Sequence, residues 1–518
     1  MKSITIALPG LLLSATLLLK APPAIAQIQA KEKNITWYTT HAPFPMPLVT
    51  GPSIPERAFP ISDYGAIGDG AFLNTSAFEK AIQACAAAGG GKVIVPPGSW
   101  LTGPIQLQSH IDFHLEQGAM ILFTRDHSQY PPLKNSTTPP LYGHDLEDIA
   151  LTGEGIIDGA GDSWRPVKKE KVTAAQWKSL LASGGALNKE ETIWWPSREG
   201  MEGGSNRDAQ RPVLLLLTNC QRILVEGVTL RNSPKFVFYP NRCTDLTMSH
   251  VTIFNEWWAQ NGDGIDISAC KNVVVYKCTV SAGDDGICMK SSGGDGRGSA
   301  GVTIGGNGKT VRDEVDANKV GGNGKLVPNE TDTSKAALQN VIIAGCTVYH
   351  AHGGFVIGSN TDGGVHNIAV SDCNFIGTDV GLRFKSNMGR GGLVDNIFIQ
   401  DIFMRDIVNE AILFDTHYED APAGSVKDLN KPTPTDKTPE FRDFHISRVY
   451  CSGARKAISI TGLPQMPVSR IRFDTLVISA GKGLVATQAR GIDLTHVKLI
   501  TVQQPVYQTD PTAEVRIR

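Results

Sequence analysis

Three aspartates stand close together in residues 261–290, NGDGIDISACKNVVVYKCTVSAGDDGICMK. Asp263 precedes a β-rich run at Asn272–Val280, and Asp284 and Asp285 follow that run. If folding brings the three together, like charge and burial raise at least one pKa, which leaves a protonated acid beside an ionised neighbour. Such a pair cleaves glycosidic bonds, because one acid protonates the leaving oxygen while the other carboxylate activates water. A separation of roughly 6.5–9.5 Å between the two would predict inversion.

Cations and a histidine follow at positions suited to an acidic substrate. Arg383 and Lys385 stand at i and i+2, so on a strand both point to one face, where they could bind the carboxylates of an acidic sugar. Asn261 and Lys290 flank the aspartates and are further candidates for substrate binding, and His352 is a candidate catalytic residue. Together they predict an anionic polysaccharide as substrate.

An Asp-Asp pair in a glycine-rich turn has simpler interpretations when it stands alone. Turn formation or calcium binding would then be favoured over catalysis. The positions of the other polar residues decide against these, because a repeat in the sequence places them on the same side of the molecule.

The repeat is a series of alternating apolar triplets. Six of the eight steps between triplets are 21–29 residues long, which predicts one coil of a solenoid per step. The expected fold is all-β: a single-stranded, right-handed parallel β-helix; a β-propeller or sandwich would need hairpin turns every 8–12 residues. The triplets begin at Ile223, Leu246, Val273, Val341, Ile368, Ile397, Phe444, Ile471 and Ile492.

Counting from the first residue of each triplet places the polar residues in one register. Neighbouring coils are about 4.8 Å apart, so side chains at similar counts should share one cleft. The counts are +11 and +12 for Asp284 and Asp285, +11 for His352, +17 for Asp263, and +15 and +17 for Arg383 and Lys385. By the same count Cys278, Cys346 and Cys373 share position +5 and should form an inward-facing stack.

Two long insertions interrupt the coils, at about 159–211 and 293–335. The second is rich in Gly, Asn and Asp and is predicted to be a loop. The first has a helical centre near Ala174–Leu181 and four tryptophans, which could either wall a sugar cleft or pack for stability: Trp164, Trp177, Trp194 and Trp195. Trp257 and Trp258, before Asn261, are similarly open to a role as a sugar platform or as core.

The N-terminal part divides into three predicted segments. Residues 1–26 have a basic start, an apolar run and an Ala-Ile-Ala cleavage site, which indicates a secretory signal; a membrane anchor would need about 20 apolar residues. We therefore expect an exported protein, periplasmic or extracellular. Residues 27–59 are proline-rich and predict an extended arm, and 60–518 form the catalytic β-helix, with a capping helix from Thr75.

Composition excludes several classes of function. The net charge is −2, so no overall field attracts nucleic acid or an anionic membrane. Nine cysteines leave at least one unpaired, and the repeat register suits buried thiols. No Cys-x-x-Cys pair or histidine-rich cluster indicates zinc, so we expect neither a metal nor another cofactor.

These residues resemble the polygalacturonase family, glycoside hydrolase family 28. The four family motifs Asn-x-Asp, Gly-Asp-Asp, Gly-His-Gly and Arg-x-Lys correspond in order to Asn261-Gly262-Asp263, Gly283-Asp284-Asp285, Ala351-His352-Gly353 and Arg383-Phe384-Lys385. The opening run ISDYGAIGDG at Ile61–Gly70 is also similar to the family's start.

The resemblance implies a right-handed parallel β-helix that hydrolyses α-1,4-linked galacturonate in pectic polysaccharide with inversion and without a metal. Asp284 would be the general acid, Asp263 and Asp285 would hold and deprotonate the water, and His352 would tune the acid. Arg383 and Lys385 would bind the substrate carboxylate.

The alternatives within and outside the family remain open from the sequence. The long insertions favour exo action, because loops that close one end of a groove admit only a chain end. Hydrolysis of rhamnogalacturonan or xylogalacturonan is the next alternative. A calcium-dependent pectate lyase on a similar β-helix, or a non-catalytic polysaccharide-binding protein, is a further one.

Overall fold

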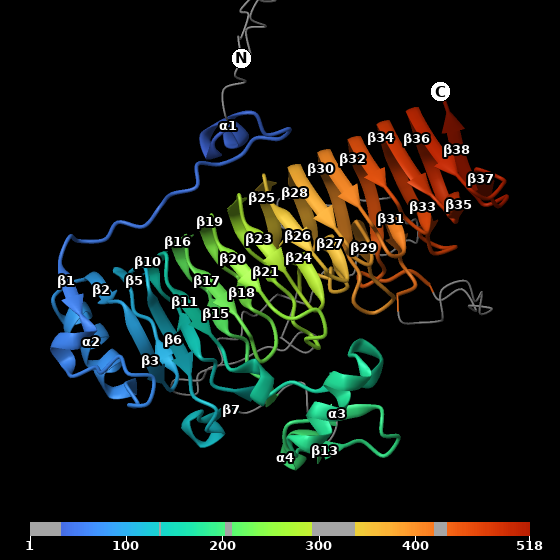
Figure 1. Cartoon of the computed structure of the whole chain (residues 1–518). Helices are drawn as coiled ribbons and strands as arrows, with labels where there is room; N and C mark the ends of the chain where they lie inside the picture. Colours follow the sequence, from blue (N-terminus) through green and yellow to red (C-terminus); the bar gives the residue numbers. More distant parts are fainter. Residues whose placement is uncertain (1–32, 134–135, 203–209, 293–336, 419–432) are drawn as a thin grey trace, which may run out of the picture.

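The computed structural model describes residues 33–133, 136–202, 210–292, 337–418 and 433–518, which form a long parallel β-helix (Figure 1). One face of the β-helix, here called the site sheet, is built from one short strand per coil. In spatial order its strands are β4 (Ile105–Gln106), β9 (Leu141–His144), β15 (Leu215–Thr218), β18 (Phe238–Asn241), β21 (Ile265–Ser268), β24 (Asp285–Lys290), β27 (Gly353–Ile357), β29 (Leu382–Lys385), β31 (Glu410–Asp415), β33 (Lys456–Thr461), β35 (Lys482–Thr487) and β37 (Tyr507–Thr509).

The other strands of the coils belong to one large, bent sheet. Its first face holds β1 (Ala58–Pro60), β2 (Gly91–Val95), β5 (Ile111–Leu115), β10 (Glu147–Gly153), β16 (Gln221–Glu226), β19 (Thr244–Ser249), β22 (Lys271–Tyr276) and β25 (Leu338–Ala344). Its second holds β3 (Gly98–Thr102), β6 (Ala119–Phe123), β11 (Ile156–Asp158), β17 (Thr229–Arg231), β20 (Thr252–Phe254), β23 (Thr279–Ser281) and β26 (Thr347–Tyr349). Both continue into β28 (Val365–Ile376), β30 (Leu393–Arg405), β32 (Glu440–Ser452), β34 (Val468–Ala480) and β36 (Ala489–Thr501), and β38 (Ala513–Ile517) pairs with β36.

The register predicted from the apolar triplets is confirmed. Leu246 pairs with Val273, Val273 with Val341, and Val341 with Ile368, all in parallel. The all-β class and the parallel β-helix are therefore confirmed as well. Successive coils place equivalent residues in direct line, which is the condition for gathering distant polar residues at one place.

The residue before each triplet makes a turn that keeps the coils in line. Asn272, Asn340, Asn367 and Asn396 all have φ between 57° and 59°. Asparagine tolerates this left-handed conformation, and its amide can bond to the next coil. The Asn340 side chain donates to the Asn272 amide oxygen at 3.1 Å, and Asn367 donates to Asn340 at 2.9 Å. The resulting asparagine ladder locks the stacking of four coils.

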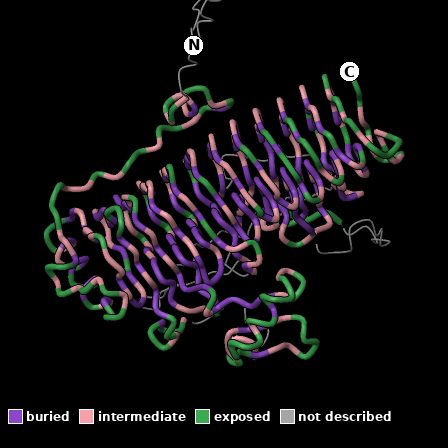
Figure 2. Tube along the Cα trace, viewed as in Figure 1, coloured by how far each residue is buried: buried purple, intermediate pink, exposed green. Residues whose placement is uncertain are grey.

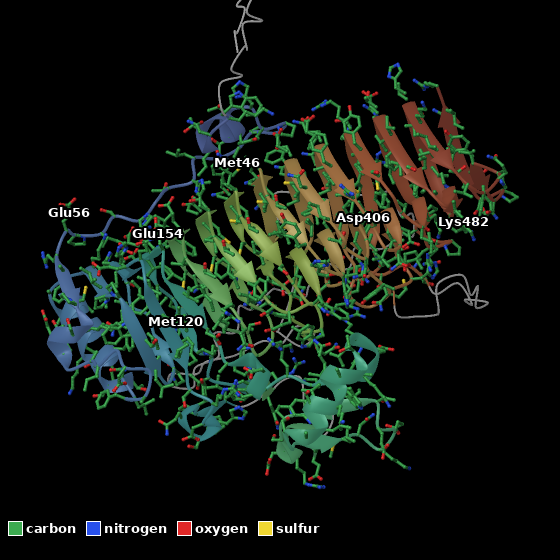
Figure 3. All side chains as sticks on the ribbon, in the orientation of Figure 1. Met46, Glu56, Met120, Glu154, Asp406 and Lys482 are labelled. Atoms are coloured by element: carbon green, nitrogen blue, oxygen red, sulfur yellow. The ribbon has the colours of Figure 1, made fainter. Side chains whose placement is uncertain are left out.

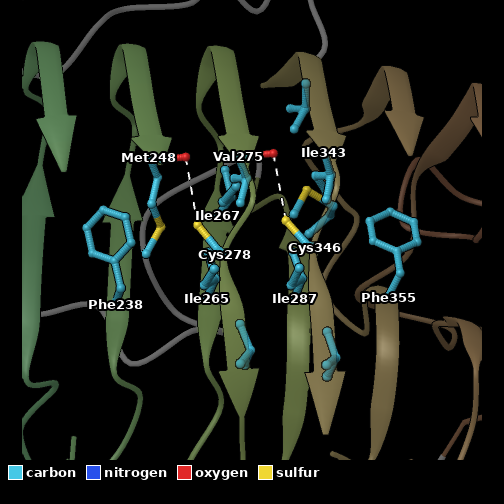
Figure 4. Close-up of a cluster of buried hydrophobic side chains, with 14 of the residues drawn as sticks. Phe238, Met248, Ile265, Ile267, Val275, Cys278, Ile287, Ile343, Cys346 and Phe355 are labelled. Atoms are coloured by element: carbon cyan, nitrogen blue, oxygen red, sulfur yellow. Dashed lines mark hydrogen bonds between the residues drawn. The ribbon is translucent and has the colours of Figure 1, made fainter. Parts of the chain in front are cut away.

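The interior of the β-helix is apolar along its length (Figure 2). The predicted stack of Cys278, Cys346 and Cys373 faces inward, with each residue at most 1% exposed. Figure 4 shows the first two between Phe238 and Phe355, their thiols directed at backbone carbonyls of the preceding coil. All nine cysteines are buried free thiols. The sequence analysis missed a second run of buried cysteines. Each of them directly precedes a strand residue that pairs with its counterpart in a neighbouring coil, so the three occupy equivalent turns: Cys220, Cys243 and Cys270.

Helices cover the N-terminal end and one outer face. The predicted cap α2 (Thr75–Ala87) places Phe78 against Phe113, with ring centroids 6.0 Å apart. A helix that the sequence did not predict, α1 (Ile35–Thr40), lies on the outer face of the solenoid (Figure 1). Its Tyr38 packs against Tyr276 and donates a hydrogen bond to Asp372 at 2.9 Å.

Residues 159–202 and 210–211, here called the tryptophan insertion, project from the β-helix (Figure 1). The insertion contains the predicted helix as α3 (Ala174–Ala182), the short helix α4 (Arg198–Glu202), and a small antiparallel sheet of β12 (Val167–Lys168), β14 (Ile193–Trp195) and β13 (Ala186–Leu187). Its four tryptophans are each no more than 8% exposed: Trp164, Trp177, Trp194 and Trp195. They stabilise the insertion by packing, and the interpretation that they wall a sugar cleft is wrong.

Some predictions lie outside the described residues, namely the signal sequence at 1–26 and the insertion at about 293–335. Within the part of the chain that the structure describes, no helix is long and apolar enough to cross a membrane. Charged side chains such as Glu56, Glu154, Asp406 and Lys482 are exposed at separate places along the surface (Figure 3).

Candidate active site

The predicted polar residues meet on four neighbouring strands of the site sheet, β21, β24, β27 and β29. Asp263 precedes β21, Asp284 directly precedes β24, which begins at Asp285, and His352 directly precedes β27. Asp263, Asp284 and Asp285 each bring one carboxylate oxygen within 4.8 Å of the others. The structure thus brings the three acids together from two successive coils.

Asp285 is held ionised by both predicted cations of β29. Arg383 donates to one oxygen at 3.0 Å and Lys385 to the other at 2.8 Å. Burial alone would raise the pKa of Asp285, but the two cations outweigh it and the pKa is lowered. Asp285 is therefore a carboxylate with both oxygens engaged.

Asp263 has the opposite electrostatic environment. Burial, together with the neighbouring charge of Asp266, raises its pKa well above the ordinary value, against the opposing effect of Lys290. The Lys290 ammonium lies 3.0 Å from Asp263 and 2.8 Å from Asp266. Lys290 thus contacts two buried acids. The sequence analysis had predicted that it binds substrate.

Asp266 is a site residue that sequence reasoning missed. It is fully buried on β21, between the core residues Ile265 and Ile267. The sequence could have identified Asp266, because it stands between two inward-facing isoleucines. Side chains alternate along a strand, so Asp266 must point outward, to the side where Asp263 and Lys290 lie.

Asp284 lies against the histidine. Its Oδ1 is 3.1 Å from Nδ1 of His352. Although burial opposes it, the hydrogen bond of His352 and the charges of Lys385 and Arg383 lower the pKa of Asp284. In the free protein the environment therefore favours the ionised form of Asp284, the acid assigned to proton donation by the family motif, whereas it favours the protonated form of Asp263.

Two further residues contact the histidine. Nζ of Lys171, from the tryptophan insertion, lies 2.9 Å from Nε2 of His352, and an Asp379 oxygen lies 3.7 Å from the same nitrogen. No repeat position could have identified Lys171, since the insertion has no counterpart in other coils. Tyr418 was missed too; its ring lies 4.8 Å from the Lys385 ammonium.

Close backbone packing fixes the loops that carry the acids. A Cβ at Gly283 would lie 2.4 Å from the Ala259 carbonyl oxygen, so only glycine fits there. Asn261 accepts a hydrogen bond from Arg211 at 2.8 Å. Trp258 packs against the tryptophan insertion, whereas Trp257 is 46% exposed.

Cations of the protein bond two of the three acids that could together hold a metal ion. Asp285 is bonded by Arg383 and Lys385, and Asp263 is paired with Lys290. Placing a divalent ion among these ammonium and guanidinium groups would be repulsive.

One oxygen of each acid lies within 4.8 Å of the others, whereas a separation of roughly 6.5–9.5 Å between two carboxyl groups would predict inversion. The two quantities differ, because the first takes a single oxygen from each side chain. The prediction of inversion therefore rests on the resemblance of the motifs to the family.

Comparison with known proteins identifies the family. The model of glycosyl hydrolases family 28 matches residues 167–320 and 325–490, together more than half of the chain. The chain belongs to this family. The matched region contains the acids, His352, Arg383 and Lys385.

Individual relatives of this family 28 protein are distant. It is 27% identical over 434 residues to the exo-poly-alpha-D-galacturonosidase of Dickeya chrysanthemi, covering 78% of this chain and 64% of that protein. It is 24% identical over 441 residues to a probable polygalacturonase of Vitis vinifera, covering 80% of this chain and 73% of that protein.

Two solved structures share the fold of this family 28 protein. The exopolygalacturonase of Thermotoga maritima superposes with a TM-score of 0.65 at 24% identity, covering 87% of this chain and 94% of that one. The family 28 exopolygalacturonase of Yersinia enterocolitica gives 0.69 at 19% identity, covering 89% and 78%.

Proposed function

We propose that this protein hydrolyses α-1,4-galacturonosyl linkages of pectic polysaccharide. The observation that carries the proposal is the cluster of three carboxylates beside Arg383 and Lys385, in a family 28 chain. The acids supply proton donation and water activation, and the cations match the carboxylates of galacturonate.

Each acid has a step in the proposed reaction. Water held by Asp263 and Asp285 attacks the anomeric carbon and gives its proton to the ionised Asp285, while Asp284 protonates the leaving oxygen. The attacking water and the leaving group lie on opposite faces, so the anomeric configuration inverts. Because Arg383 and Lys385 engage both oxygens of Asp285, this carboxylate stays ionised beside the water and is a poor nucleophile toward carbon.

Binding of substrate should raise the pKa of Asp284, so that this acid holds a proton when it is needed. A galacturonate carboxylate beside Arg383 adds negative charge and draws on one of the groups that lower the pKa of Asp284, after His352 and Lys385. Both effects raise the pKa of Asp284. The proton held by the three-acid cluster then passes from Asp263 to Asp284, which titrate as a coupled group.

The pH dependence of activity follows from this shared proton. We expect a bell-shaped kcat/KM profile whose basic limb lies above the ordinary aspartate range, because activity is lost as the raised pKa of the cluster is passed. The acid limb lies below that range, since the pKa of Asp285 is lowered. Initial rates of reducing-end release against pH measure both limbs.

A variant checks the origin of the basic limb. Asp266→Asn removes a charge that raises the pKa of Asp263, so the limb should move to lower pH. A basic limb at or below the ordinary aspartate pKa in the wild type, or one unmoved in the variant, would contradict the shared-proton model.

We also propose that the enzyme acts from the chain end and is exported. The tryptophan insertion reaches the catalytic histidine through Lys171, which supports a groove closed on one side, and a relative from Dickeya chrysanthemi carries an exo designation. Residues 1–26 support export as a secreted or periplasmic enzyme.

Product analysis tests the function and the mode of action together. On polygalacturonate we expect mono- or digalacturonate from the first time points, without unsaturated product and without loss of activity in chelator. Proton NMR of the first product should show the inverted anomer. A ladder of intermediate oligomers would exclude exo action, and a chelator-sensitive rise in ultraviolet absorbance would identify a lyase instead.

A further inference from the structure

The tryptophan insertion is fixed to the coils of the active site by two buried arginines. Arg165, 3% exposed, donates to Glu256 at 2.7 Å. Arg211, also 3% exposed, donates to the Gln260 carbonyl at 2.7 Å and to Asn261 at 2.8 Å. All three bonds end on the loop that leads to Asp263, so the insertion is held at its two ends against the catalytic coils.

This anchoring places the ammonium group of Lys171 beside the catalytic histidine. Lys171 ends the short 3-10 helix η4 (Lys169–Lys171), between β12 and α3. Its Nζ lies 2.9 Å from Nε2 of His352, whose Nδ1 lies 3.1 Å from Asp284. The imidazole is therefore bridged between a lysine on one nitrogen and the acid on the other.

The donor chemistry fixes where the imidazole carries its hydrogen. An ammonium has three hydrogens and no lone pair, so Lys171 can only donate, and Nε2 must accept. A neutral imidazole that accepts at Nε2 carries its hydrogen on Nδ1, facing Asp284.

Several charges surround this pair. Burial lowers the pKa of Lys171, and Lys168 acts in the same direction. Asp284, Asp379 and Glu170 act against them and favour the ammonium form.

We infer that Lys171 is a positioning residue, which holds His352 in the tautomer that donates from Nδ1 to Asp284. The inference rests on the proposed function for its catalytic consequence. When Asp284 gives its proton to the leaving oxygen, a carboxylate forms, and the Nδ1 hydrogen stabilises it at that moment. In the other tautomer a lone pair would face Asp284, which would repel the new carboxylate or remove the proton before it is used.

Kinetics separate this role from binding of substrate. Lys171→Met should lower kcat on polygalacturonate about 10–100-fold with KM within about twofold, because the lost interaction acts in the transition state. Lys171→Arg, which can still donate to Nε2, should recover part of kcat. Lys178→Met, an exposed lysine of α3 in the same insertion, is the matched control and should behave as wild type. A raised KM with unchanged kcat would overturn the inference in favour of a direct contact with substrate.

The tautomer is measured without substrate. In protein labelled with ¹⁵N-histidine, two-bond proton–nitrogen correlation should show His352 with a protonated Nδ1 and an unprotonated Nε2, assigned by the signal missing from His352→Asn. In Lys171→Met this pattern should give way to the Nε2-protonated form or a mixture, while circular dichroism confirms folding. An unchanged tautomer in the variant, or an Nε2–H form in the wild type, would overturn the inference. This readout stands even if the product analysis disproves galacturonan as substrate.

Discussion

Asp284→Asn should lower kcat by about 10²–10⁴-fold while leaving substrate affinity within a few-fold of wild type. The amide keeps the size of the side chain, and its oxygen still accepts from Nδ1 of His352, 3.1 Å away in the wild type. The amide has no acidic proton to give to the leaving oxygen, so the loss falls on the chemical step. Steady-state rates on polygalacturonate and calorimetric binding of an oligogalacturonide measure the two parts.

The matched control for this variant is Asp406→Asn on the exposed surface (Figure 3). It makes the same chemical change away from the cluster and should leave both quantities unchanged. Turnover of Asp284→Asn within tenfold of wild type would refute proton donation by this residue, and the pH profile would then point to Asp263 as the donor.

Lys385→Met should remove most activity and destabilise the protein by about 3–5 kcal/mol at neutral pH. The substitution leaves one oxygen of the buried Asp285 without its partner at 2.8 Å, so Arg383 alone compensates a buried carboxylate that had two cations, which is costly. Chemical denaturation at a series of pH values measures the effect. In the wild type the lowered pKa of Asp285 contributes stability above about pH 4, which is lost as the pH falls through the folded-state pKa. The deficit of the variant should therefore shrink as the pH falls and Asp285 takes up a proton.

A double variant distinguishes loss of charge pairing from loss of packing. Lys385→Met with Asp285→Asn removes this ion pair, while Arg383 keeps the amide oxygen as an acceptor, so the double variant should regain part of the stability but no activity, because the base is gone. Lys482→Met, an exposed lysine, is the surface control (Figure 3). If the double variant were as unstable as the single one, packing of the lysine stem rather than the ion pair would account for the loss.

The stacking register was predictable because each coil carries the same short sequence pattern. The first and last residues of apolar triplets such as Val273–Val275 and Val341–Ile343 face one interior, and each triplet is preceded by an asparagine that tolerates a left-handed turn. Once that register is known, the convergence of Asp284, His352 and Arg383 follows by counting.

The charge state of each acid could not be predicted in the same way. Asp263 and Asp285 are both buried acids in short motifs, yet the pKa of one is raised and that of the other lowered. The difference depends on ion-pair geometry and on Asp266, whose role appears only when two coils are stacked. The pKa of an acid depends on its burial and on charged partners within a few ångströms. The spacing of residues along the sequence gives neither quantity.

The sequence by itself determined the solenoid, its register and the side of it on which the polar residues gather, since these depend on periodicity. The tertiary structure alone decided which cation pairs with which acid, that the tryptophans of the insertion are buried, and that Lys171 reaches His352. An insertion outside the repeat has no register to count from, so its contacts are set by how it folds back onto the coils.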